Sequence, residues 1–246
     1  MYTSTNINTN MNMNSNMNGK LGMASSIINV CAVLAFALCN PFGYLFGCYL
    51  SSIFIAFSFV PMICAFAENG DARTKAAGNT AMIFAGMYAV IILLVYFAQL
   101  TAVRLETLNA QAASLIDYTK FGLFFNYDLL GYCFMALATF FAGMTISVKD
   151  NNHSGAPEQK SSIFHKLFAR GRRITFKATK KTGIALKLLL MIHGVFAISC
   201  FIIPILGIFN NDMQDAEWIG KAILEFWCLY FIPVGVLSYM YFKTGS

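Results

Sequence analysis

Five polar side chains stand out because long apolar segments surround them: Asn29, Gln99, Asp128, His193 and Glu225. Polar groups are costly inside a bilayer, so residues of this kind mark substrate and ion pathways. Their side chains suit proton uptake, cation binding or hydrogen bonding to a polar solute. We predict a polar column across a helical bundle, with an outer cluster (Gln99, Asp128, Glu225) and an inner pair (Asn29, His193).

Two of these residues receive specific roles in this prediction. Glu225 would take up the proton or cation, and His193 would relay it, because histidine ionises near neutral pH. Counted from Lys187, His193 lies about 9 Å into its helix. Packing offers another interpretation, since Lys221 can pair with Glu225 four residues later and His193 can form a hydrogen bond within the bundle.

Transmembrane helices must hold these groups. Of the 246 residues, 58% are hydrophobic and 11% are charged, and the mean hydropathy is +0.62. A soluble domain has about 25% charged residues, so a soluble globular enzyme, a disordered chain and a disulfide-rich secreted scaffold are excluded. The 47 positions from 21 to 67 contain no charge. As one helix they would measure about 70 Å, so they must form two spans, with the break at Asn40-Pro41.

The charge-free runs predict an all-α, polytopic bundle of six membrane helices, near 21–39, 42–66, 77–103, 129–148, 188–209 and 218–242. In this division Asp128 would cap the helix that starts at Leu129. Residues 1–20 are rich in Asn, Thr and Met, and we predict that they are disordered. Ala35-Phe36-Ala37 is similar to a signal cleavage site, but the next span follows almost at once, which favours an uncleaved first span.

Basic residues predict the orientation of the bundle. Segment 149–187 contains ten of the 17 Lys and Arg residues, and we expect it to be cytoplasmic. With six spans, both termini then lie on the cytoplasmic side. This orientation places 14 Lys and Arg residues on the cytoplasmic side and three on the outer side. We therefore expect an integral protein of the cytoplasmic membrane.

The basic loop is the basis of an alternative function. From Ser161 its apolar residues recur at helical spacing, which predicts a short amphipathic helix with a cationic face. Such a loop would bind anionic lipid headgroups or an acidic protein partner, whereas nucleic acid is not expected, because no recognition module accompanies it. The alternative is thus a non-catalytic membrane subunit or scaffold, with a protein partner or a second copy of the chain. The residues concerned are Lys166, Arg170, Arg172, Arg173, Lys177, Lys180 and Lys181.

Motifs for enzymatic chemistry are missing from the sequence. There is no H-E-x-x-H, no G-x-S-x-G and no complete phosphate-binding loop, so we predict no catalytic residues. The seven cysteines lie in or next to the spans and form no C-x-x-C pair, so we predict no metal site and no cofactor. Transport of a small solute, an ion or a proton is the first prediction.

Overall fold

The structure, a computed structural model, describes residues 3–106, 108–147, 181–208 and 217–245. Every regular element in these residues is helical. In chain order they are α1 (Thr3–Cys39), α2 (Leu45–Asn69), α3 (Lys75–Ala98), the π-helix η1 (Gln99–Val103), α4 (Ala110–Ile116), the 3-10 helix η2 (Tyr118–Lys120), α5 (Leu123–Thr145), α7 (Phe196–Ile205) and α8 (Glu217–Gly245). A further helical stretch begins at Lys181 and leads into α7.

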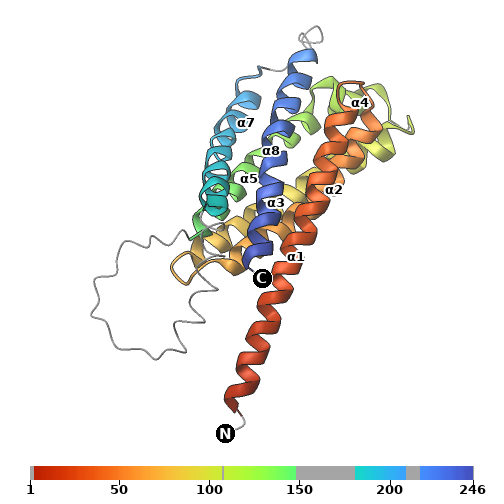
Figure 1. Cartoon of the computed structure of the whole chain (residues 1–246). Helices are drawn as coiled ribbons and strands as arrows, with labels where there is room; N and C mark the ends of the chain where they lie inside the picture. Colours follow the sequence, from red (N-terminus) through yellow and green to blue (C-terminus); the bar gives the residue numbers. More distant parts are fainter. Residues whose placement is uncertain (1–2, 107, 148–180, 209–216, 246) are drawn as a thin grey trace.

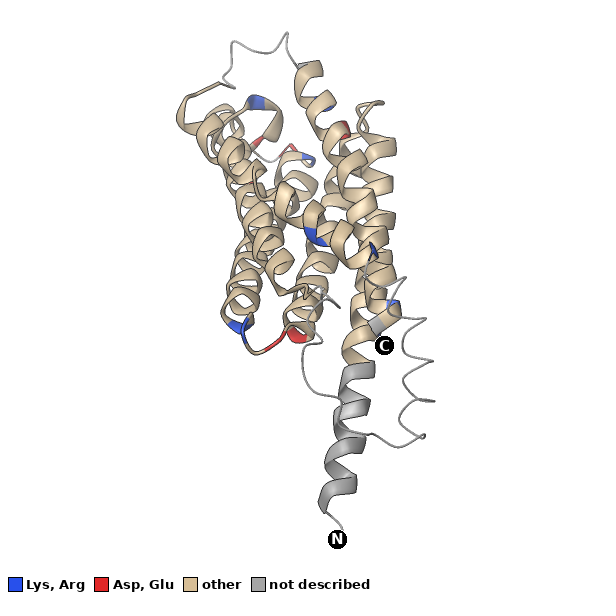
Figure 2. Cartoon of the chain, turned by 60° about the vertical axis from the view of Figure 1, so that its left-hand side comes forward, with Lys and Arg blue, Asp and Glu red and all other residues tan. Residues whose placement is uncertain are grey.

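In the part of the chain that the structure describes, six helices are long and apolar enough to cross a membrane, as predicted: Met17–Cys39, Leu45–Asn69, Lys75–Val103, Leu123–Thr145, Lys181–Ile205 and Trp218–Thr244. Most of the length of these helices carries neither acidic nor basic residues (Figure 2). α1 begins and α8 ends at the same end of the bundle, which we name the terminus end (Figure 1). The opposite end carries α4, and we name it the loop end.

Some boundaries differ from the prediction. α5 begins at Leu123, so Asp128 lies within the helix and the prediction that it caps the helix is wrong. The predicted span started after Asp128 because that residue is acidic, but neighbouring side chains bury Asp128 inside the helix. The fifth span begins at Lys181, which places His193 about 18 Å along it. α1 begins at Thr3 and includes residues predicted to be disordered, because a helix propagates from a formed turn at little cost per residue.

The fifth span is interrupted beside His193. The amides of Gly194 and Val195 donate to carbonyls only three residues back, over 3.2 and 3.0 Å, which tightens the chain into a turn. A Cβ atom on Gly194 would lie 2.7 Å from that of Phe140, so glycine allows α5 to approach closely here. Three prolines lie inside helices: Pro61 in α2, Pro204 in α7 and Pro233 in α8.

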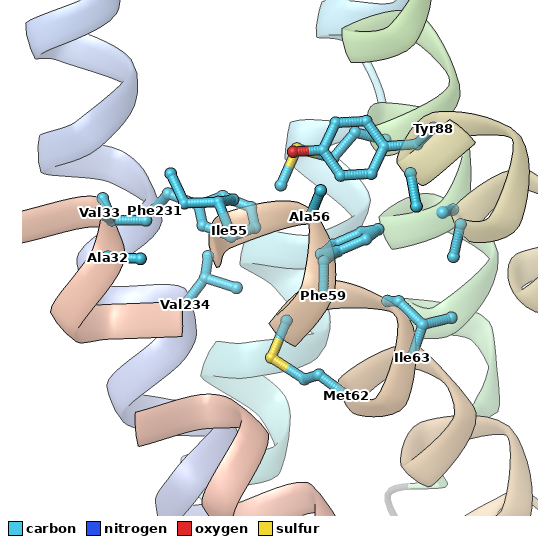
Figure 3. Close-up of a cluster of buried hydrophobic side chains, with 14 of the residues drawn as sticks. Ala32, Val33, Ile55, Ala56, Phe59, Met62, Ile63, Tyr88, Phe231 and Val234 are labelled. Atoms are coloured by element: carbon cyan, nitrogen blue, oxygen red, sulfur yellow. The ribbon is translucent and has the colours of Figure 1, made fainter. Parts of the chain in front are cut away.

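The packing core lies around α2. α1 packs against α2 and α8, α3 packs against α2 and α5, and α7 packs against α5. In the core, the ring of Phe59 contacts Tyr88 of α3 at 5.2 Å and Phe231 of α8 at 6.3 Å between centroids (Figure 3). In lipid, such interlocking of side chains replaces the exclusion of water as the force that holds helices together.

Candidate functional site

The structure brings two of the five predicted column residues together. Gln99 in η1 and Asp128 in α5 both form hydrogen bonds with Tyr118, near the loop end. The other three have separate partners among the described residues: Asn29, His193 and Glu225. Four of the five are at most 1% exposed: Asn29, Gln99, Asp128 and His193.

Asp128 is a carboxyl buried about 8 Å from the start of α5. Its Oδ2 atom accepts a hydrogen bond of 3.2 Å from the hydroxyl group of Tyr118. Its Oδ1 atom has no hydrogen-bond partner in the described part of the chain. No basic side chain among the described residues forms an ion pair with this carboxyl. An uncompensated buried carboxyl is costly, which makes this position the strongest candidate for a functional site.

Five tyrosines are close enough to Asp128 to interact electrostatically with its carboxyl, and we name them the tyrosine cage: Tyr49 of α2, Tyr88 and Tyr96 of α3, Tyr118 of η2 and Tyr132 of α5. Three of the rings, those of Tyr49, Tyr96 and Tyr118, have centroids 5.5, 6.1 and 6.0 Å apart. The other two rings lie 6.1 Å apart. Of these tyrosines, Tyr118 donates the hydrogen bond to the carboxyl. The site thus combines one acidic group with aromatic rings from four elements.

The sequence analysis missed the tyrosine cage, although part of it left a signal. Tyr132 follows Asp128 by four residues, so the two share one face of α5. Tyr49 and Tyr118 come from segments far apart in the chain, and only the tertiary structure brings them to the carboxyl.

A short segment, residues 110–120, covers the site at the loop end, and we name it the cover segment. Local capping shapes it, because Asn109 accepts a hydrogen bond from the amide of Ala112 at 2.8 Å and Asp117 accepts one from the amide of Thr119 at 3.0 Å. Phe121 then adopts a left-handed conformation with φ of 52° and ends η2. The segment therefore carries its own turn signals.

Gln99 attaches the cover segment to the end of α3. Its Nε2 atom donates to the carbonyl of Ile116 at 2.8 Å, and its Oε1 atom accepts from the amide of Tyr118 at 3.0 Å. Burial raises the pKa of the Tyr118 phenol well above its usual value of 10, so this phenol stays neutral and donates to Asp128. Gln99 therefore positions the residue that contacts the carboxyl.

His193 is held by side chains of α5 and α8. The indole Nε1 of Trp227 donates to its Nε2 atom at 3.1 Å, and its Nδ1 atom lies 2.8 Å from the hydroxyl oxygen of Thr139. Because an indole can only donate, Nε2 must accept, and the ring proton of the neutral imidazole is assigned to Nδ1. The hydroxyl group of Thr139 in turn donates to the carbonyl of Ala136 at 2.8 Å. A second ring proton would face the indole N–H, so proton relay by His193 requires Trp227 to move away.

Glu225 lies at the loop end of α8, where α1 ends. The side-chain amide of Asn40 donates to its Oε1 atom at 2.8 Å and to the carbonyl of Lys221 at 3.2 Å. Glu225 thus connects α8 to the turn between α1 and α2, and it does not contact Asp128 through a hydrogen bond in the described chain.

Asn29 lies inside α1, where its Nδ2 atom donates to the hydroxyl oxygen of Ser58 at 3.0 Å and to the carbonyl of Ile55 at 3.4 Å. Its Oδ1 atom has no hydrogen-bond partner among the described residues. Asn29 and His193, which the sequence analysis predicted as an inner pair, therefore have separate partners. Asn29 contacts α2, and His193 contacts α5 and α8.

Most of the basic loop lies outside the described residues, including Lys166, Arg170, Arg172, Arg173, Lys177 and Lys180. Lys181 is described, and it is exposed at the start of the fifth span. In the ranges that the structure describes, no three His, Cys, Asp or Glu residues are grouped so that they could hold a metal ion.

Comparison of the chain with protein-family models, with curated proteins and with solved structures finds no match in any of the three.

Proposed function

We propose that this multi-pass membrane protein carries a proton or a small cation across the membrane, with Asp128 as the group that binds the charge. One observation supports this proposal above the others: a carboxyl that is 1% exposed, with one oxygen lacking a partner in the described chain, lies inside a transmembrane helix. Buried polar atoms usually have a hydrogen-bond partner, so the unpartnered oxygen of this ionisable group supports a role in binding a ligand.

The proposed path opens at the loop end of the bundle. Following the distribution of basic residues, we place the termini in the cytoplasm and the loop end outside, in the cytoplasmic membrane. A charge would then enter past Tyr118 and reach Asp128 about 8 Å along α5. Beyond Asp128, a path by way of His193 and Asn29 toward the cytoplasm stays a prediction.

Flux measurements on reconstituted protein test this proposal. The purified chain is placed in liposomes with a pH-sensitive dye inside, and flux is driven by a potassium diffusion potential. We expect Asp128→Asn to reduce proton flux at least tenfold, because an amide of the same shape cannot bind the charge. Glu225→Gln is the matched control, since its remaining oxygen can still accept from Asn40, and it should retain flux. Equal flux through wild type and Asp128→Asn, or no flux above empty liposomes with protons or with monovalent cations, would contradict the proposal.

A further inference from the structure

We propose that Asp128 and the tyrosine cage form a binding site for a small protonated amine, a cation of about the size of methylammonium. The inference rests on the proposed function, because it names the class of cation that the same carboxyl would carry. It depends on three features: the charge of the site, the aromatic rings around it and the way the cover segment closes it.

The charge of the site suits a monovalent cation. Asp128 supplies one negative charge when it is ionised, and no described basic side chain forms an ion pair with it. Ca²⁺ requires six to eight oxygen ligands and usually several carboxylates. The described residues contain no group of three acidic, Cys or His side chains that could hold a metal ion. A single positive charge is therefore the better match.

The aromatic rings favour an organic cation over a hydrated inorganic one. Ring faces of tyrosine attract ammonium groups, and cages of such rings are a recurrent way to bind them. The ring centroids of Tyr49, Tyr96 and Tyr118 lie within 6.1 Å of one another, and Tyr88 and Tyr132 form a second ring pair with centroids 6.1 Å apart. An amine could thus place an N–H group on Asp128 and its carbon atoms against the rings.

The contact that closes the site is weak enough to exchange. The hydroxyl oxygen of Tyr118 lies 3.2 Å from Oδ2 of Asp128, which is longer than the usual 2.5–3.0 Å of such bonds. An ammonium group would replace it with a shorter, charge-assisted bond. No residue of α4 is buried, so this part of the cover segment can be displaced without exposing a packed core. Tyr118 itself is partly buried, and its displacement would break its ring contacts with Tyr49 and Tyr96. Gln99 bonds the cover segment at Ile116 and Tyr118, and re-forming these two hydrogen bonds would restore the closed position of the segment.

Ligand-dependent thermal stability of the purified full chain in detergent tests the site. Methylammonium chloride is titrated against sodium chloride at equal concentration, since a ligand that binds the folded state raises the melting temperature. We expect stabilisation that saturates with methylammonium, exceeds that with sodium, and is lost in Asp128→Asn. Sodium chloride that stabilises as well as methylammonium, or stabilisation by methylammonium that persists in Asp128→Asn, would overturn the inference.

A pair of variants at Tyr118 keeps the test decisive if Asp128→Asn does not fold. Tyr118→Phe retains the ring, and we expect its affinity for methylammonium to stay within about threefold of wild type. Tyr118→Leu removes the ring, and the loss of a desolvated cation–π contact should weaken binding about tenfold. Equal affinities in the two variants would argue against the aromatic site.

The binding and flux assays separate the two proposals. Asp128-dependent proton flux without any effect of methylammonium would overturn the amine site and leave the transport proposal standing. Asp128-dependent binding of methylammonium without flux of protons or of methylammonium would support the site and overturn transport.

Discussion

Trp227 donates its indole N–H to Nε2 of His193 over 3.1 Å, and this bond connects α8 to the helical stretch that ends at the Gly194 turn. The two rings also belong to one aromatic contact network, because Phe231 stacks on Trp227 at 4.9 Å and packs on His193 at 5.3 Å. A helix that is interrupted by a turn lacks continuous backbone hydrogen bonding there, so side-chain contacts of this kind must hold its two parts in place.

We expect Trp227→Phe to lower the free energy of unfolding by about 1–3 kcal/mol, because it leaves Nε2 of His193 buried without a donor. Thermal unfolding in detergent measures the loss. ¹⁵N NMR of the imidazole should also show that the ring proton no longer resides on Nδ1 alone. Trp218→Phe is the control, since Trp218 is 68% exposed and should tolerate the change. Equal losses in both variants would show that the hydrogen bond contributes nothing.

The bond between Asn40 and Glu225 should stabilise the contact of α8 with the turn after α1. In a double-mutant cycle with Asn40→Ala and Glu225→Ala, we expect a coupling energy of about 0.5–1.5 kcal/mol, typical of a partly buried hydrogen bond. Glu225→Gln retains an acceptor oxygen and should lose less stability than Glu225→Ala. Additive effects of the two alanine substitutions would contradict this assignment.

Two glycines of α8 should respond in opposite ways to alanine. A Cβ atom on Gly235 would collide with a methyl group of Val30 in α1, whereas a Cβ atom on Gly220 would meet nothing within 4 Å. Valine has little rotamer freedom in a helix, so the side chain of Val30 cannot move aside. We expect Gly235→Ala to destabilise the protein by about 1–3 kcal/mol and Gly220→Ala to stabilise it by about 0.5–1 kcal/mol through helix propensity.

Adding Val30→Ala to Gly235→Ala should restore most of the lost stability, because it removes the colliding methyl group. The melting temperatures of the single and double variants in detergent measure the effect. A double variant that is less stable than either single variant would show that the contact between α1 and α8 is not limited by this collision.

The turn between α2 and α3 should depend on pH through Asp71. The guanidinium group of Arg73 bonds its carboxylate at 3.1 Å, and the amides of Arg73 and Thr74 donate to it at 2.9 and 3.2 Å. These bonds hold the pKa of Asp71 below its usual value of 3.8. Because the folded pKa is the lower one, the stabilisation is complete above the usual pKa and disappears as the pH falls through the folded value.

NMR titration of the Asp71 carboxyl carbon in micelles measures this shift. Arg73→Gln should raise the midpoint toward the usual 3.8, whereas Lys75→Gln, which leaves the Arg73 bond intact, should change it little. A midpoint that does not respond to Arg73→Gln would assign the shift to the backbone amides.

One feature of the candidate site, the proximity of Gln99 and Asp128, was predictable from the sequence. Gln99 and Asp128 were placed in one outer cluster because both lie near the same ends of their spans, and the structure joins them through Tyr118. Glu225 was placed in the same cluster, but its hydrogen bond goes to Asn40. Depth along a helix is readable from residue counts, whereas the direction in which a side chain points around the bundle depends on how each helix is rotated against its neighbours.

The sequence by itself determined the number of spans and their even parity, because the preference of a residue for lipid is a local property that adds up along a run of about 20 positions. Only the tertiary structure decided which polar groups meet. Tyr118 reaches Asp128, Trp227 reaches His193 and Asn40 reaches Glu225 across helices that are far apart in the chain or separated by a turn. Such partners are selected by the packing of whole helices, which no short pattern of residues encodes.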